Sequence, residues 1–378
     1  MANTLTGLIP TLYQAVDVVS RELVGLVPAV TMDAQATRAA LNQTVMSPVA
    51  PAASATDVTP GVTPPDDGDQ TIGNATITIS KSRRVPVRWN GEQSVGINSG
   101  PGRANVLRDQ FAQAMRTLVN EIEADLAALY AKASRVYGTA GTTPFATAGD
   151  YSDVGFVRKI LMDNGAPTSD LQLVINTTAG ATFRGKQSQA QMESDNQLRR
   201  QGVLLDVHGM MIRESAQIKS HTKGTGASYL SNLLAGYAIG DTSIAIDTGS
   251  GTVLAGDVVT FAGDTNKYVN GTALTGGSIV LNEPGLRAAL ADGVAMTVGN
   301  SYTANMAFHR GAIQLATRAP ALPDEGDMAD DRMMLTDPVS GLTFEVAMYR
   351  QYRQVQYEVA LAWGAACTKS EHLAILLG

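Results

Sequence analysis

Cysteine is almost absent from the sequence. Cys367 is the only one in 378 residues, which excludes an intrachain disulfide and a zinc site built from several thiolates. Its neighbours at 364–366 are small and apolar, so we expect an inert thiol and not an activated nucleophile. This cysteine usage is typical of a chain that is made in a reducing cytoplasm.

Positive charge and long apolar runs are also scarce. The chain has 28 Lys and Arg against 35 Asp and Glu, which gives a net charge of -7. Proteins that grip nucleic-acid phosphates need the opposite sign, so a DNA-binding enzyme is disfavoured. No apolar stretch reaches the length of about 18 residues that a membrane span needs, and no basic segment precedes the short apolar run at 5–10. We expect no membrane contact and no export signal.

Recognisable catalytic and metal-binding patterns are missing as well. His208, His221, His309 and His372 have no paired spacing. The glycine-rich segment 96–102 lacks the spacing of a phosphate-binding loop. Acidic pairs within 320–331 could hold a divalent cation weakly, but a solvated loop is the preferred interpretation. We expect no enzyme activity, no cofactor and no metal.

The composition that is present indicates an extended α+β molecule. With 37 Gly, 15 Pro and only 5% aromatic residues, the chain should have many turns and strands but few large core side chains. Its length indicates two or three structural units.

An amphipathic segment occupies residues 8–30. Its apolar positions recur at the period of one helical face; they include Leu12, Val16, Val19 and Leu23. A terminal helix that is followed by more than forty weakly patterned residues is poorly placed to build its own core. We expect it to lie on the rest of the chain or on a neighbour.

A Pro- and Asp-rich stretch at 48–71, which contains Asp66 and Asp67, predicts a mobile loop tip. After it, the extended segments 75–80 and 85–89 are expected to be the arms of a long hairpin. Such a hairpin is unstable and sticky unless another surface covers it.

The returning arm of this hairpin is basic. Its cations are Lys81, Arg83, Arg84 and Arg88. A solvated charged strand is the first interpretation, and a subunit contact and nucleic-acid binding are the alternatives.

The longest helix is predicted over 104–137, because apolar residues recur every three or four positions without Gly or Pro. Its opposite face is charged and is interpreted as solvated; it includes Glu121, Glu123 and Asp125. A shorter helix is expected at 151–164 and a buried strand at 171–175. His208 and Gly209 could form the turn of a hairpin between 203–207 and 210–214.

The segment 224–300 is rich in glycine and poor in charge. Its short β-runs at 243–246, 258–261, 278–281 and 294–298 predict an inserted small β-barrel or sandwich. The closing region predicts a hairpin from 332–336 and 342–349, followed by a strand at 355–363.

Several motifs resemble one known family. The sequence reads TGLIPTLYQA at 6–15, VVSRELVG at 18–25, MAFHR at 306–310, DPVSGL at 337–342 and YRQY at 349–352. Together, and in this order, they resemble the Salmonella short-tailed phage coat family, which comprises major capsid proteins of tailed double-stranded DNA phages.

The resemblance implies an α+β fold of the Hong Kong phage capsid type. It implies the following division: an N-terminal arm at 1–47, an extended loop at 48–97, the spine helix and peripheral domain at 98–150, an axial domain at 151–223, an inserted β domain at 224–300, an axial return at 301–331 and a peripheral sheet with the C-terminus at 332–378.

The resemblance also implies a function. The chain would self-assemble as pentamers and hexamers into an icosahedral head shell around packaged DNA that it does not bind sequence-specifically. Assembly would occur in the bacterial cytoplasm, with a separate scaffolding protein, a portal protein and, in some cases, a decoration protein. The candidate subunit-contact residues are Leu12, Val16, Val19, Leu23, Asp66, Asp67, Lys81, Arg83, Arg84 and Arg88.

Two other classes of protein stay open. A decoration or tail-tube protein would share the β-rich, enzyme-free character but would not need the long helix. A hydrolase would need a nucleophile, a base and an orienting group together, and the sequence pattern does not bring these together.

Overall fold

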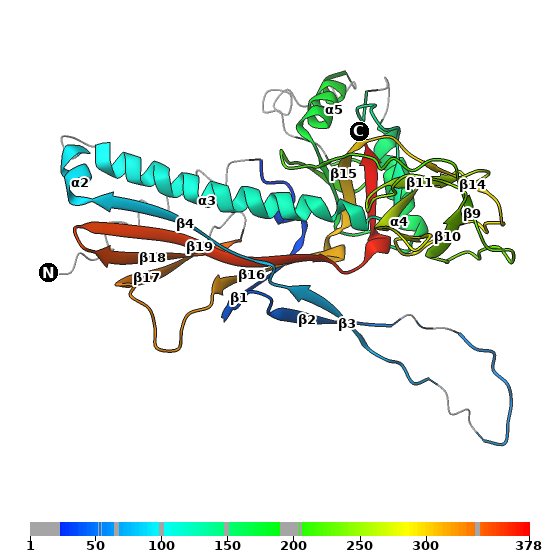
Figure 1. The fold of residues 1–378 in the computed structure, drawn as a ribbon, viewed down its shortest axis with the longest axis horizontal. Coiled ribbons are helices and arrows are strands. Elements are labelled where there is room, and N and C mark those ends of the chain that lie inside the picture. Colours follow the sequence, from blue (N-terminus) through cyan, green and yellow to red (C-terminus); the bar gives the residue numbers. More distant parts are fainter. Residues whose placement is uncertain are drawn as a thin grey trace.

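The computed structural model describes residues 23–51, 53, 55–63, 68–97, 102–146, 151–189, 204, 206–336 and 341–378. A long helix lies along one sheet, and a second sheet continues into a small barrel at the other end of the molecule (Figure 1). A two-stranded hairpin projects away from both. None of the helices within the described ranges is long and apolar enough to cross a membrane.

The first sheet has six strands. Five follow in the order β1 (Thr31–Ala39), β16 (Ile313–Pro320), β19 (Gln354–Cys367), β18 (Thr343–Gln351) and β17 (Asp331–Thr336), and β4 (Lys81–Asn90) pairs with the other side of β19. Strands β17, β18 and β19 confirm the strands expected for the closing region.

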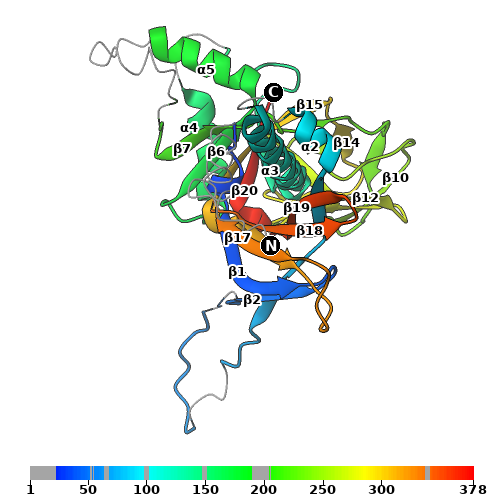
Figure 2. The ribbon, with the colours of Figure 1, turned by 90° about the vertical axis from the view of Figure 1, so that its left-hand side faces the viewer.

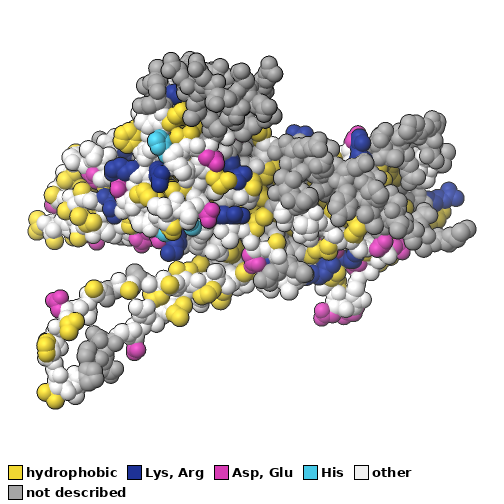
Figure 3. Space-filling model, turned by 180° about the vertical axis from the view of Figure 1, so that it is seen from behind, with side chains coloured by type: hydrophobic (Ala, Val, Ile, Leu, Met, Phe, Trp, Pro, Cys, Tyr) yellow, Lys and Arg dark blue, Asp and Glu magenta, His cyan; other side chains and the backbone are white. Residues whose placement is uncertain are grey.

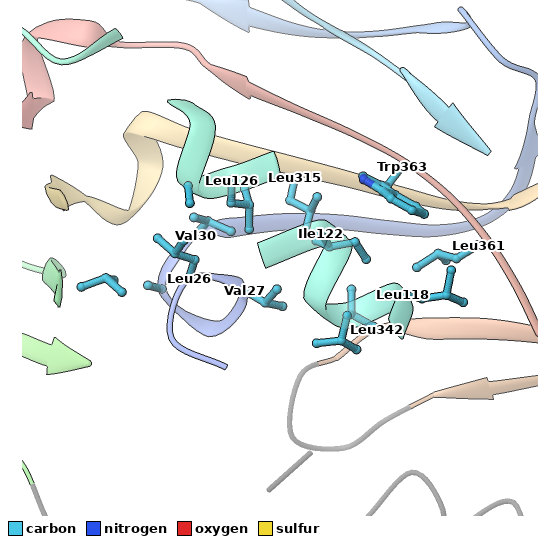
Figure 4. Close-up of a cluster of buried hydrophobic side chains, with 14 of the residues drawn as sticks. Leu26, Val27, Val30, Leu118, Ile122, Leu126, Leu315, Leu342, Leu361 and Trp363 are labelled. Atoms are coloured by element: carbon cyan, nitrogen blue, oxygen red, sulfur yellow. The ribbon is translucent and has the colours of Figure 1, made fainter. Parts of the chain in front are cut away.

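Helix α3 (Gly102–Ala128) covers this sheet, as the end-on view shows (Figure 2). Its buried face is the predicted one, with Phe111, Met115, Leu118, Ile122 and Leu126 at most 1% exposed. These side chains belong to the same apolar cluster as Leu361 and Trp363 of β19 (Figure 4). A short helix, α2 (Gly91–Ile97), connects β4 to this layer.

The predicted extent of the long helix is wrong at its C-terminal end. The α-helix stops at Ala128, a 3-10 turn spans Leu129–Lys132, and Arg135–Tyr137 is strand β5. Strand pairing takes over because β5 lies between β20 (Leu373–Leu377) and β12 (Tyr268–Thr275). Sheet hydrogen bonds and burial of Val136 therefore override a favourable helical pattern.

The predicted arms of the long hairpin are also wrong. The projecting hairpin is formed by β2 (Thr44–Val49) and β3 (Gly73–Thr78), whereas β4 is part of the six-stranded sheet. Val87 and Trp89 of β4 are buried in the cluster under α3, which explains why this strand stays on the body. The hairpin therefore begins at Thr44, inside the segment that was expected to be the N-terminal arm.

The second sheet contains β5, β20, β15 (Tyr302–His309), β6 (Leu171–Ile175) and β7 (Met210–Glu214), in that order. Helix α4 (Ser152–Asp163) contacts β5, β15 and β20, and α5 (Thr177–Gln189) follows β6. The expected helix at 151–164 and buried strand at 171–175 are confirmed. The expected hairpin around His208 is limited to one bridge between Val207 and Met210, because β7 pairs in parallel with β6.

All four predicted β-runs of the segment 224–300 are strands, and together with two strands that were not predicted, β9 and β12, they close into a ring. The ring order is β11 (Val258–Phe261), β14 (Ala295–Val298), β9 (Tyr229–Ser231), β10 (Ser243–Asp247), β13 (Ser278–Leu281) and β12, and β12 pairs back to β11. This barrel has its own apolar cluster, which includes Ile244, Phe261 and Tyr268. The chain enters and leaves it side by side, because β8 (Ser220–His221) pairs with Tyr302 and Thr303.

Strand order also shows that the expected units share elements. Strand β16 lies in the six-stranded sheet and not with β15, and β20 lies in the larger sheet and not with β19. The chain passes from one sheet to the other at two 3-10 turns, residues 310–312 before β16 and residues 370–372 before β20. The boundary that was expected between residues 331 and 332 therefore does not coincide with the division between the two sheets.

Candidate subunit-contact surfaces

The projecting hairpin exposes apolar side chains. Val58 and Val62 in its loop are almost completely exposed, and Met46 and Ile72 are about two-thirds exposed. The view from behind shows hydrophobic side chains along the length of the hairpin (Figure 3). An isolated two-stranded ribbon with such a surface is unstable in water, so this hairpin is suited to contact another molecule.

The base of the hairpin is held firmly against the body. Ile77 and Ile79 are buried with Ala316 and Ala362 in a small separate cluster. Gly364 lets β3 cross β19 closely, because a Cβ atom there would lie 1.9 Å from the carbonyl oxygen of Thr78. The hairpin therefore leaves the body in a fixed direction.

The Lys81 side chain is directed toward α3 and is only partly exposed to solvent. Its Nζ lies 2.8 Å from Oδ1 of Asp125 and 3.0 Å from Oε1 of Glu121. Burial by itself would lower the pKa of Lys81, but the hydrogen bonds to the two carboxylates outweigh burial and raise that pKa. Arg83 shares the same partner, with Nε 3.3 Å from Oε1 of Glu121. Lys81 thus joins β4 to α3 within one chain.

Arg84 and Arg88 point to the opposite face of the sheet. Arg84 donates from Nη1 to Oε2 of Glu358 at 2.8 Å, yet its side chain remains 58% exposed. Arg88 is exposed, and no ion pair of it is found within the described ranges. Together with Arg83, which lies on the α3 side, these two side chains make the strand basic on both faces. We define Arg83, Arg84 and Arg88 as the basic edge, because β4 pairs only with β19 among the described strands. Charged residues on an edge strand discourage indiscriminate strand pairing.

The remaining sequence-predicted contact residues are described only in part. Leu23 is half exposed. Leu12, Val16, Val19, Asp66 and Asp67 lie outside the described residues.

The sequence analysis missed an ion network on the face of the six-stranded sheet to which Arg84 points. Glu345 is buried and accepts from Arg38 on one oxygen and from Arg332 on the other, both at 2.6 Å. Arg332 also contacts Asp327, and this hydrogen bond lowers the pKa of Asp327 to about 2. The loop 321–330, expected to be merely solvated, is therefore tied to β17 and β18. Arg332 and Glu345 lie on the paired strands β17 and β18, whereas Arg38 comes from the distant strand β1, so no local pattern predicts that all three side chains meet.

A second missed surface lies on the barrel. The loop between β9 and β10 exposes Leu234 and Ile239, while Tyr237 between them is buried. Backbone hydrogen bonds in both directions join Tyr237 to Leu290 and hold the loop. The sequence signal was an adjacent Leu-Leu pair in a segment that is otherwise poor in large side chains.

A hollow of about 690 Å³ lies at the far end of the six-stranded sheet. Trp89, Val355 and Tyr357 form its apolar lining, and Glu92, Arg350 and Arg353 are its charged members. Trp89 donates from its indole nitrogen to Oε1 of Gln110 at 2.8 Å. The hollow has no set of catalytic groups among these residues.

The structure does assemble one arrangement that resembles a catalytic triad. Nδ1 of His221 lies 2.8 Å from the hydroxyl of Tyr130, and Nε2 lies 2.8 Å from Oδ1 of Asp257. Both His221 and Asp257 are buried, and Asp257 also accepts the N–H groups of Gly224 and Leu254. This arrangement therefore joins the barrel to the 3-10 turn that follows α3. Within the described ranges, no group of three or more His, Cys, Asp or Glu could hold a metal, and burial raises the pKa of Cys367 to about 12.

No model of a known protein family matches the sequence, and no curated protein matches it. Solved structures do match. The capsid of cyanophage P-SCSP1u is similar over 92% of this chain and 86% of that chain, with a TM-score of 0.50 and 12% identity. A chain of Mycobacterium phage Che8 is similar over 89% and 84%, with a TM-score of 0.44 and 10% identity. A virus-like particle from Pyrococcus furiosus is similar over 97% of this chain and 97% of that chain, with a TM-score of 0.40 and 9% identity.

The likeness to the cyanophage capsid establishes the fold. The chain is mixed α and β, mostly β, and has the Hong Kong phage type capsid fold. The resemblance found in the sequence motifs is therefore confirmed at the level of fold.

Proposed function

We propose that the chain is a phage major capsid protein. It self-assembles as pentamers and hexamers into the icosahedral head shell of a virion and encloses packaged double-stranded DNA. The observation that carries this proposal is the fold that it shares with a phage capsid over most of both chains. The exposed apolar hairpin, which has no core of its own, supports it.

Each structural unit has a proposed role in this account. Residues 1–43 are the N-terminal arm, and the hairpin from Thr44 to Thr78 is the extended loop. Helix α3 is the spine of the peripheral domain. The six-stranded sheet belongs to the same domain, and the arm contributes its strand β1. The sheet of β15, β6 and β7 belongs to the axial domain, and the barrel within 224–300 is the inserted domain.

The extended loop is proposed to bind the basic edge of a neighbouring subunit. Asp57 and Asp69 are exposed in this loop, and the sequence adds Asp66 and Asp67. Arg83, Arg84 and Arg88 supply the opposite charge on a strand edge. Val58 and Val62 would bury their side chains in the same contact, which supplies the larger share of the binding free energy.

The partners follow from the same proposal. Assembly uses a separate scaffolding protein and a portal protein, and a decoration protein is a further candidate. The net charge of -7 suits a wall that encloses DNA without gripping it. The shell would form in the bacterial cytoplasm and remain part of the virion.

Particle formation tests the proposed function. The full chain is expressed alone and together with the gene products encoded beside it, and the lysates are separated by sedimentation and imaged by electron microscopy. Closed isometric shells are the expected product. Open rings, tubes of constant width or monomers under every condition would contradict the proposal, and tubes would favour a tail-tube protein.

Charge reversal tests the proposed loop contact. Arg84→Glu with Arg88→Glu should reduce shell yield at least about tenfold, and Asp66→Lys with Asp67→Lys in the same chain should restore part of it. Lys159→Glu is the matched control, because Lys159 is an exposed cation on α4, 66% exposed, and lies outside the basic edge. Equal yields from the charge-reversed chain and the control would exclude this contact.

A further inference from the structure

Glu123 is a buried carboxylate in the middle of α3, only 1% exposed. The sequence pattern placed it on the solvated face, and this prediction is wrong. Both of its oxygens accept hydrogen bonds from outside the helix. Oε1 accepts the N–H of Val27 at 2.7 Å and that of Leu26 at 2.9 Å, and Oε2 accepts the hydroxyl of Ser215 at 2.7 Å.

The donors come from two segments that are far apart in sequence. Leu26 and Val27 lie at the base of the N-terminal segment, where the 3-10 turn Val27–Ala29 begins. Ser215 follows β7 and begins the connection that leads through β8 into the barrel. Figure 4 shows Leu26 and Val27 among Leu118, Ile122 and Leu126 of α3. One side chain of α3 therefore holds the start of the described chain and the approach to the barrel.

The two segments also touch each other directly. A Cβ atom on Gly25 would lie 2.5 Å from the carbonyl oxygen of Glu214 and 3.1 Å from Cβ of Ser215. Only a residue without a side chain permits this approach. The contact continues to α5, because Glu214 forms an ion pair with Arg184.

Displacement of either segment from Glu123 destabilises the contact of the other segment with the same carboxylate. A carboxylate that is removed from water depends on its donors, and loss of part of them leaves a buried charge incompletely hydrogen-bonded. Displacement of residues 25–27 would leave Glu123 with Ser215 alone. Displacement of Ser215 would equally weaken the hold on residues 26 and 27, since coupling free energies between two sites are reciprocal.

We propose that Gly25, Glu123 and Ser215 form a junction that couples the position of the N-terminal arm to the conformation of residues 206–221. A neighbour that pulls on the arm thereby changes the segment that carries the barrel. This consequence for assembly rests on the proposed capsid function, whereas the junction itself is a property of the single chain.

Hydrogen exchange of the unassembled full-length chain tests the junction. The backbone amides of residues 26 and 27 report on the arm base, and those of 215 and 217 report on the other segment, because they donate to Ile175 and to the Ser215 hydroxyl. Ser215→Ala should speed exchange at residues 26 and 27 by about tenfold, although these lie more than 180 positions away in sequence. Glu123→Gln should speed exchange at both places.

Glu121→Gln is the matched control, because Glu121 is on the same helix and pairs with Lys81 and Arg83 at the surface. It should leave both sets of amides unchanged. If Ser215→Ala alters exchange only within its own segment, the coupling is absent. Should Glu123→Gln fail to fold, Ser215→Ala decides the question by itself.

Shell formation separates this inference from the proposed function. Coupled exchange in a chain that never forms shells would support the junction and contradict the capsid proposal. Normal shells from a chain without coupled exchange would support the capsid proposal and contradict the junction.

Discussion

Nζ of Lys81 lies 2.8 Å from Oδ1 of Asp125, while the indole nitrogen of Trp363 donates to Oδ2 of the same carboxylate at 2.9 Å. One carboxylate of the long helix thus holds the edge strand β4 and the central strand β19. The Lys81 ammonium also lies 5.8 Å from the centre of the Trp363 ring. The point at which the hairpin returns to the body is therefore fixed by charge and by packing.

Lys81→Met should remove this connection and keep most of the apolar stem of the side chain. Because the Lys81 side chain is only 30% exposed and has two carboxylate partners, we expect a loss of about 1 kcal/mol in the free energy of unfolding. Urea denaturation of the unassembled chain measures it. Arg88→Met is the control on the same strand and should change stability by less than about 0.5 kcal/mol. Equal losses in the two variants would contradict the account of Lys81.

Gly364→Ala should disturb the base of the hairpin. The new Cβ would overlap the Thr78 carbonyl, which is backbone and cannot rotate away. We expect a destabilisation of roughly 1 to 3 kcal/mol in denaturant unfolding. Gly185→Ala in α5, where a Cβ meets no atom within 4 Å, should be neutral or stabilising by up to roughly 1 kcal/mol. A stable Gly364→Ala chain would mean that β3 does not cross β19 this closely.

His221→Ala should weaken the joint between the barrel and the body. The substitution removes a partner from the buried carboxylate of Asp257 and from the hydroxyl of Tyr130. We expect a loss of about 3 kcal/mol in the free energy of unfolding. Lys223→Ala, an exposed neighbour, serves as the control and should cost less than about 0.5 kcal/mol. If the two variants unfold alike, these hydrogen bonds do not join the two parts.

The pH dependence of stability tests the environment of Glu123. Burial raises the pKa of this carboxyl in the folded chain, and its hydrogen bonds from Val27, Ser215 and Leu26 only partly oppose the rise. The folded state therefore binds the proton more tightly than the unfolded state. This contribution to stability is fully present below the unfolded pKa of about 4.5 and is lost as the pH rises through the folded pKa.

Comparison with Glu123→Gln isolates that contribution, because the other titrating groups are common to both chains. The stability of the wild-type chain relative to Glu123→Gln should increase as the pH falls from neutral toward about 4.5. Unfolding free energies measured across this range provide the test. A relative stability that instead increases with rising pH would show that the hydrogen bonds outweigh burial.

Short-range patterns predicted many of the elements. Four of the six barrel strands, β10, β11, β13 and β14, as well as β6 and β18, carry their burial pattern within a few consecutive residues, so the sequence identifies them without knowledge of their partners. The barrel strands β9 and β12 were not predicted. The partner of β3 could not be found in this way. Strand β2 contains Pro48 and is separated from β3 by a loop of more than twenty residues, whereas β4 follows β3 almost directly and was the more obvious partner.

The role of Glu123 was hidden for a different reason. It lies between Glu121 and Asp125, which keep contact with solvent, and a lone carboxylate among charged residues is usually solvated. A weaker signal was present. Val119 and Ala127, each four positions away, are only 3% and 1% exposed, so the apolar stripe of α3 is wide enough to include position 123. Its donors come from residues 26, 27 and 215, and no local pattern predicts such a meeting.

Electron cryo-microscopy of assembled particles tests the central claim most directly. The full-length chain is reconstructed in its shell, and the hairpin between Thr44 and Thr78 is traced relative to the neighbouring subunits. The account predicts a closed shell of pentamers and hexamers in which Val58 and Val62 are covered by an adjacent subunit beside its Arg84 and Arg88. A shell in which the hairpin contacts only its own subunit, or the absence of any closed shell, would contradict it.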